Sequence, residues 1–209
     1  MKPHKITEGF EKAICDYTGA PYCVAVDSQS NALSMALIYE DVRDKEITIP
    51  SHTYPSVPCE IILAGGKVRF EKSPQMLKGA YRLKPTRIWD SALRFTGDMY
   101  IPNTFICLSF TGQWKHLKLC KGGAILTDSL QAYLWFKRYR YSGRRECLYH
   151  NDQFDFIGKN YYMPHIIAAL GLQMITGFYN LDGTKKVMED IELPYPDLSK
   201  FKVYTLANR

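Results

Sequence analysis

Strand-like and helix-like segments alternate through the first third of the chain, and this alternation limits the possible fold more than any other feature. Short β patterns at 22–27, 46–50 and 67–70 are interleaved with helical patterns at 30–39 and 56–64, behind an opening helix at 7–17. Strands that alternate with helices at this spacing are typical of an α/β fold. The sequence therefore predicts a mostly parallel sheet flanked by helices.

The second half of the chain continues the pattern. We predict strands at 87–90, 104–110 and 124–127, a helix from 129 to about 141, a polar and aromatic connection at 143–159 and an apolar helix at 164–178. In the last helix we expect five buried side chains: Ile166, Ile167, Leu170, Met174 and Ile175. The stretch 71–86 is weakly patterned, and no element is predicted there.

The chain has 209 residues and 46% apolar content, enough for one substantial core. Its net charge of +6 is moderate, and the basic residues are spread out apart from the clusters at 137–140 and 144–145. Such a cluster is most often a solvated helix face. Anionic small molecules and nucleic acid, whose phosphates attract the same side chains, stay open as alternative partners.

Six cysteines without a CxxC spacing indicate reduced thiols in a cytoplasmic protein. The five histidines show no metal-site spacing, so no metal is expected. The N-terminus has no apolar signal core, and no stretch reaches the ~20 apolar residues of a membrane span. A membrane partner is therefore not expected.

Two side chains suggest cofactor chemistry. Lys115 follows the predicted strand 104–110, and Asp90 ends the predicted strand 87–90, about 25 residues earlier. An amine at a strand end can form a Schiff base with an aldehyde cofactor, and an acid in this position can pair with a pyridinium nitrogen. Most lysines at strand ends are merely solvated, so the pair is more informative than either residue alone.

Two further features have both a functional and a structural explanation. Ser28, Gln29 and Ser30 lead from a strand into a helix, where backbone N–H groups and hydroxyls can bind an anion. A plain N-cap serine needs no ligand, however. Tyr54 follows the strand at 46–50 and could lie against an aromatic ligand. In a chain with 13% aromatic residues, a core tyrosine is the alternative.

An ordered set of motifs resembles the DegT/StrS-type sugar aminotransferases, over roughly residues 7 to 190. The motifs are Ser28-Gln29-Ser30-Asn31-Ala32-Leu33, Pro50 to Tyr54, Trp89-Asp90-Ser91-Ala92, Ser109 to Lys115, Gly122-Gly123, and Gly158-Lys159-Asn160-Tyr161-Tyr162-Met163 with Ala168-Ala169-Leu170. The resemblance implies a pyridoxal 5′-phosphate (PLP) enzyme of the aspartate aminotransferase fold. It implies a trimmed large domain of fold type I at 1–192, with the C-terminal domain largely missing and a short tail at 193–209.

The same resemblance implies a role for each site residue. Lys115 would form the Schiff base, with Lys118 and Lys121 as rival candidates, and Asp90 would pair with the pyridine nitrogen. The cofactor phosphate would be bound by Ser28, Gln29, Ser30 and Ser109, and Tyr54 would lie against the cofactor ring. Asn160 would reach the phosphate of a neighbouring subunit, which implies a homodimer with shared sites.

The sequence departs from the family pattern at several of these positions. Gln29 replaces a glycine, Ser30 a threonine and Tyr162 an arginine. Leu93 stands where the family has a glutamine or histidine, and Ser109 lies one residue further from Lys115 than in the family. These changes affect the phosphate contacts and the tuning of the cofactor ring.

The favoured function is transfer of an amino group from an amino acid, such as glutamate, to a keto sugar, with a nucleotide-linked sugar as the preferred substrate. One alternative is a small PLP enzyme of the same fold that acts on an amino acid or on a modified nucleobase in DNA. Another is a homodimer of this fold that no longer catalyses. The retention of both Asp90 and Lys115 argues against the last alternative.

Overall fold

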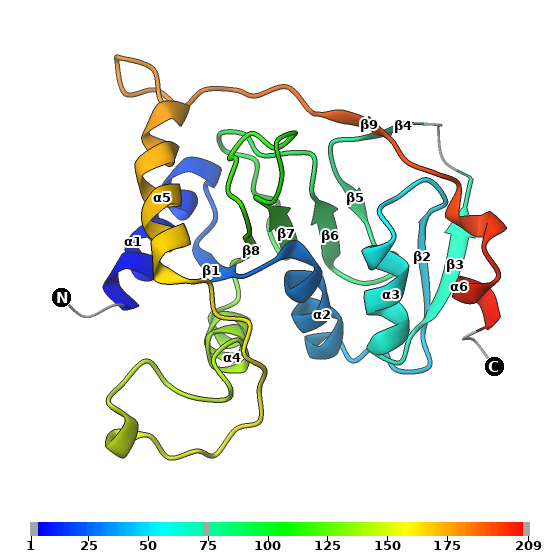
Figure 1. Cartoon of the computed structure of the whole chain (residues 1–209), viewed down its shortest axis with the longest axis horizontal. Coiled ribbons are helices and arrows are strands. Elements are labelled where there is room, and N and C mark those ends of the chain that lie inside the picture. The colour runs from blue at the N-terminus through cyan, green and yellow to red at the C-terminus, as the bar shows by residue number, and fades with distance from the viewer. Residues whose placement is uncertain (1–3, 73–75, 207–209) are drawn as a thin grey trace.

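The computed structural model describes residues 4–72 and 76–206, which form a five-stranded β-sheet and two two-stranded sheets together with helices (Figure 1). The helices are α1 (His4–Thr18), α2 (Gln29–Tyr39), α3 (Ser56–Leu63), α4 (Leu130–Tyr139), α5 (His165–Ile175) and α6 (Val203–Leu206). The strands are β1 (Tyr22–Val26), β2 (Glu46–Pro50), β3 (Lys67–Glu71), β4 (Met76–Lys78), β5 (Tyr81–Arg82), β6 (Ile88–Ser91), β7 (Phe105–Ser109), β8 (Gly123–Thr127) and β9 (Glu192–Pro194). Each element predicted before position 71 is present, with ends shifted by at most a few residues.

The main sheet has the strand order β1-β8-β7-β6-β5. The ladders β6–β7 and β2–β3 are parallel, whereas β1–β8, β7–β8 and β5–β6 are antiparallel. A bridge between Thr48 and Lys84 connects β2 to the end of this sheet. The α/β class is confirmed, but the sheet is more mixed than predicted. β5 and β6 are joined by residues 83–87 alone, which are too few for the crossover that a parallel pair needs. β8 runs antiparallel to both of its neighbours, β1 and β7.

Two apolar cores lie on opposite faces of the sheet. In β7, Phe105 and Cys107 pack into the core formed with α2 and α4, while Ile106 and Leu108 pack into the core formed with α1 and α5. Successive strand residues point to opposite faces, so a strand that is apolar throughout must be covered on both sides. The continuous apolar sequence of β7 therefore fixes its central position.

Helix α5 is buried on one face only, which corrects the sequence prediction. Ile166 is 77% exposed and Leu170 is 41% exposed, whereas Ile175 is buried as expected. The buried face packs against α1 at Gly171, where a Cβ would lie 2.6 Å from the ring of Phe10. An apolar helix is predicted to be buried all round, but within the described residues only one side of α5 is covered.

The weakly patterned stretch 71–86 does contain strands, although none was predicted there. β4 pairs with β9 from the C-terminal segment over three residue pairs, and β5 pairs with β6 over two. Strands this short carry no visible period. The C-terminal segment is also held by Leu198, which is buried and donates its backbone N–H to Ser51 O at 2.8 Å. No helix among the described residues is long and apolar enough to cross a membrane.

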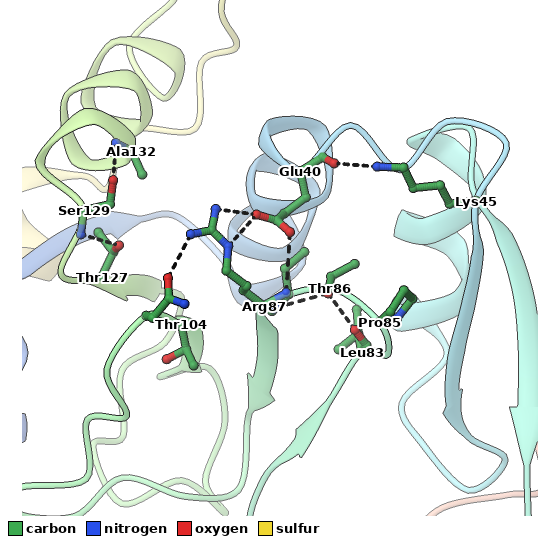
Figure 2. Close-up of polar contacts among 12 residues, drawn as sticks. Glu40, Lys45, Leu83, Pro85, Thr86, Arg87, Thr104, Thr127, Ser129 and Ala132 are labelled. Carbon is green, nitrogen blue, oxygen red and sulfur yellow. Dashed lines mark hydrogen bonds and ion pairs between the residues drawn. The ribbon is translucent and has the colours of Figure 1, made fainter.

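A partly buried ion pair ties the start of β6 to the end of α2 (Figure 2). Arg87 donates through Nε and Nη2 to Glu40 Oε1 at 3.0 and 2.7 Å, and its guanidinium lies 4.7 Å from the ring centroid of Phe105. The side chain of Glu40 is only 16% exposed. This contact positions the strand that carries Asp90 at its other end.

Replacing Arg87 with methionine should therefore lower the free energy of unfolding by about 1–2 kcal/mol, because two hydrogen bonds from a partly buried guanidinium group to the carboxylate of Glu40 are lost. Chemical denaturation of the variant beside the wild type measures this change. Arg43→Met is the matched control, since Arg43 pairs with Asp41 on the exposed surface near the same helix end and should have no measurable effect. Equal stabilities of the Arg87 variant and the wild type would contradict the assigned role.

Candidate active site

A cavity of about 440 Å³ lies where the N-termini of α2 and α3 face the carboxyl ends of β6 and β7. Its volume is within the range of about 300–1,000 Å³ that is typical of small-molecule sites. The lining residues are Ser28, Gln29, Ser30, Tyr54, Ser56, Ala92, Ser109, Thr111, Gly112, Trp114, Lys115, Leu193, Pro194 and Tyr195. A larger hollow of about 560 Å³ lies beside α1 and contains none of the predicted site residues.

Lys115 lies in the loop between β7 and β8 and reaches into this cavity. Its Nζ donates to the carbonyl oxygen of Ala92 at 2.6 Å. Burial lowers the pKa of Lys115, and the negative charge of Asp90 opposes this shift in part. The rival candidates do not line the cavity, since Lys118 is exposed and Lys121 pairs with Asp27 at 3.3 Å. Lys115 is thus the lysine with access to a cavity ligand.

Asp90 is buried at the end of β6. Its Oδ1 accepts hydrogen bonds from Ala92 N at 2.9 Å and from Gln29 Nε2 at 2.5 Å, and its Oδ2 accepts one from Tyr81 OH at 3.0 Å. Burial raises the pKa of Asp90, while these hydrogen bonds and the charge of Lys115 act in the opposite direction. The carboxyl group is therefore oriented by donors on several sides.

Ala92 connects the two predicted catalytic residues. Its carbonyl oxygen accepts from Lys115, and its backbone N–H donates to Asp90. The amine and the carboxyl group thus lie at the same end of the sheet, on either side of one residue. Such an arrangement is what a ligand needs if it is to meet an amine and an acid at the same time.

The turn at 28–30 presents the first backbone N–H groups of α2 to the cavity. Ser28 caps the helix by accepting from Asn31 N at 3.2 Å. Gly123 allows β8 to approach the turn closely, because a Cβ at this position would lie 2.6 Å from Gln29 N. A capped helix N-terminus that faces a cavity favours an anion such as a phosphate.

Comparison with known proteins identifies the architecture. The model of the DegT/DnrJ/EryC1/StrS aminotransferase family matches residues 3–74. No curated protein matches the chain in sequence. Among solved structures, the chain is similar to the Helicobacter pylori PseC aminotransferase, which is involved in the biosynthesis of pseudoaminic acid, with a TM-score of 0.65 and 15% identity over 84% of this chain and 62% of that chain.

Two further structures show the same similarity. DesV of S. venezuelae, solved with a ketimine intermediate, gives a TM-score of 0.65 at 19% identity over 83% of this chain and 57% of that chain. NtdA of Bacillus subtilis, solved with bound cofactor PMP, gives 0.63 at 18% identity over 81% and 47%. The chain has the fold of the PLP-dependent aminotransferases. It spans about half to three-fifths of the length of these relatives. The resemblance found in the sequence is confirmed.

The residues around the cavity match the reactive groups of PLP. The cavity offers an amine at Lys115 for the aldehyde, a helix N-terminus for the phosphate, and the hydroxyls of Ser28, Ser30 and Ser109. Asp90 lies beneath Gln29, whose flexible side chain must move for a ring nitrogen to reach the acid. The charged groups and hydrogen-bond donors around the cavity therefore fit PLP once the side chain of Gln29 has moved away from Asp90.

Of the two remaining predicted site residues, Tyr54 lines the cavity and Asn160 does not. Tyr54 is 56% exposed and lines the cavity, with its ring centroid 6.0 Å from that of Tyr195 at an interplanar angle of 71°. Asn160 is exposed and does not line the cavity of its own chain, although its backbone bridges Tyr141. The structure thus brings together every predicted site residue except Asn160.

Several residues of the site were not predicted. Tyr81 donates to Asp90 and shares a 2.6 Å hydrogen bond with Thr53, but it lies on a two-residue strand without a sequence signal. Leu193, Pro194 and Tyr195 form one wall of the cavity, and burial raises the pKa of Tyr195 to about 12. Only the aromatic character of this C-terminal segment could have indicated it.

Proposed function

We propose that this chain is a PLP-dependent aminotransferase that transfers an amino group from an amino acid to a keto sugar, with a nucleotide-linked sugar as the substrate. The observation that carries the proposal is the convergence of Lys115, Asp90 and the α2 N-terminus on a single cavity. The fold similarity to PseC, an aminotransferase involved in the biosynthesis of pseudoaminic acid, supports a sugar-type substrate.

PLP, when bound, supplies an aldehyde and a ring that accepts electrons from the substrate carbon. Side chains of the protein would transfer the protons and keep the ring nitrogen protonated. Because burial lowers the pKa of Lys115, its Nζ is more readily available as a free amine and can carry a proton to and from the substrate. Asp90 would hold a proton on the ring nitrogen, and Tyr81 and Ala92 would keep its carboxyl group in position.

Binding of the cofactor would depend on the turn at 28–30 and on β7. The backbone N–H groups of this turn, with Ser28, Ser30 and Ser109, would hold the phosphate. Tyr54 lines the cavity and would lie against the ring, which would exclude water from that face. Tyr195 would close the side of the cavity next to Tyr54.

The wider organisation follows from the same proposal. Residues 1–192 would form the cofactor-binding domain and 193–209 a short tail, of which Leu193, Pro194 and Tyr195 line the cavity. A homodimer would bring Asn160 of one subunit to the phosphate site of the other, which agrees with the exposure of Asn160 in the single chain. The six cysteines, all in the described part of the chain, are free, which supports a cytoplasmic location.

Reduction with borohydride tests the proposal directly. Purified protein incubated with PLP should be yellow, and reduction should attach the cofactor to one residue, Lys115, as read by peptide mass spectrometry. Lys115 should be labelled at a lower pH than exposed lysines, because a lower pKa leaves more free amine at a given pH. Attachment spread over Lys118 and other surface lysines would refute the proposed site.

A further inference from the structure

Gln29 connects two parts of the candidate site that a cofactor would also connect. Its backbone belongs to the turn at the start of α2 and lines the cavity. Its side chain extends to the acid, where Nε2 donates to Asp90 Oδ1 at 2.5 Å and to the carbonyl oxygen of Cys107 at 3.3 Å. One side chain thus spans the path from the phosphate turn to the buried carboxyl group.

The side chain of Gln29 also separates Asp90 from the cavity. Asp90 is only 3% exposed and is absent from the cavity lining, whereas Gln29 is part of it. A carboxylate has about four lone-pair positions, and Ala92, Gln29 and Tyr81 already occupy three of them. Of these donors, Ala92 N is backbone, and Tyr81 is held by its strand pairing with Asp90 and by Thr53, so Gln29 is the one that can move.

We infer that the carboxamide of Gln29 competes with the ring nitrogen of PLP for Asp90. This inference rests on the proposed function. The hydrogen bond that the amide N–H of Gln29 donates to Oδ1 of Asp90 is the same kind of hydrogen bond that a protonated ring nitrogen would make to this carboxyl group. Cofactor binding then requires this bond to break and the side chain to turn away.

This competition lowers the affinity of the protein for the cofactor. Breaking a hydrogen bond to a charged group opposes binding, so the protein binds PLP less tightly than a variant without the donor. Pyridoxamine phosphate, which cannot bond covalently to Lys115, should be affected in the same way. Gln29 therefore lowers the affinity for both forms of the cofactor.

Titration of the cofactor-free protein with PLP and with pyridoxamine phosphate tests the inference, with binding followed by tryptophan fluorescence. Gln29→Ala and Gln29→Met should each bind both compounds about 10-fold more tightly than the wild type. Methionine has a similar length but no donor, so it retains the packing if alanine impairs folding. Gln131→Ala, at an exposed position on α4, is the matched control and should bind as the wild type does.

Unchanged or weaker binding in both Gln29 variants, with Lys115 of the wild type still trapped by borohydride, would overturn the inference and leave the proposed function intact. That result would mean that Gln29 supports Asp90 in the loaded protein instead of competing with its ligand. Failure of the wild type and both variants to bind either compound would overturn both proposals.

Discussion

Replacing Lys115 with alanine is expected to abolish amino transfer, lowering kcat by about 10⁴-fold or more. Under the proposed function the side chain would have two tasks, covalent attachment of the cofactor and transfer of a proton at the substrate carbon, and no other lysine lines the cavity. Single-turnover kinetics with an amino acid donor, followed by the change in cofactor absorbance, measure the effect.

Lys118→Ala provides the control for this variant, because Lys118 is exposed, lies three residues away and does not line the cavity. Its kcat should equal that of the wild type. A small amine such as methylamine should partly restore proton transfer in the Lys115 variant, whereas a variant that had merely misfolded would not respond. Retention of more than about a tenth of the wild-type rate by Lys115→Ala would rule out a catalytic role.

Replacing Asp90 with asparagine is expected to lower kcat on the order of 10²–10³-fold while the fold is retained. Asparagine keeps an oxygen that can accept from Ala92 N and from Gln29, and its amide can donate to Tyr81. The negative charge that would hold a proton on the ring nitrogen is lost. Steady-state rates and the absorbance of bound cofactor measure this effect.

Thermal unfolding across pH separates the catalytic role of Asp90 from a structural one. Burial raises the pKa of Asp90, so the folded state holds this proton more tightly than the unfolded state does. Ionisation therefore reduces stability as the pH rises from the ordinary value of 3.8 through the raised pKa. Asp90→Asn lacks this loss, so its melting temperature relative to the wild type should increase over that range. A variant that lost stability and activity together at neutral pH would contradict this account.

The sequence predicts the fold where local pattern and packing agree. Strand β7 is apolar throughout and central in the sheet, and Ser28 both ends the β pattern and caps α2. Lys115 and Asp90 could be proposed from the sequence because Lys115 follows a recognisable strand and Asp90 lies at the end of one. Their common contact with Ala92 required the fold, since the two loops that meet there are separate in the sequence.

The sequence does not predict contacts that depend on tertiary structure alone. Tyr81 orients Asp90 from a strand of two residues, which is too short to show a period. The C-terminal segment lines the cavity through a ladder of three residue pairs with β4. The exposure of Ile166 could not be foreseen either, because an apolar helix carries no signal for which of its sides a neighbour will cover.

The ion pair of Glu40 with Arg87 and the hydrogen bond of Gln29 with Asp90 fasten opposite ends of the same helix and strand, α2 and β6. As long as the bond of Gln29 is intact, both ends of the two elements are joined, and the turn at 28–30 stays at a constant distance from Asp90. The candidate Schiff-base residue, Lys115, lies on a different segment, the loop of residues 110–122. Insertions or deletions in that loop can therefore shift Lys115 during evolution without altering the distance between the turn at 28–30 and Asp90.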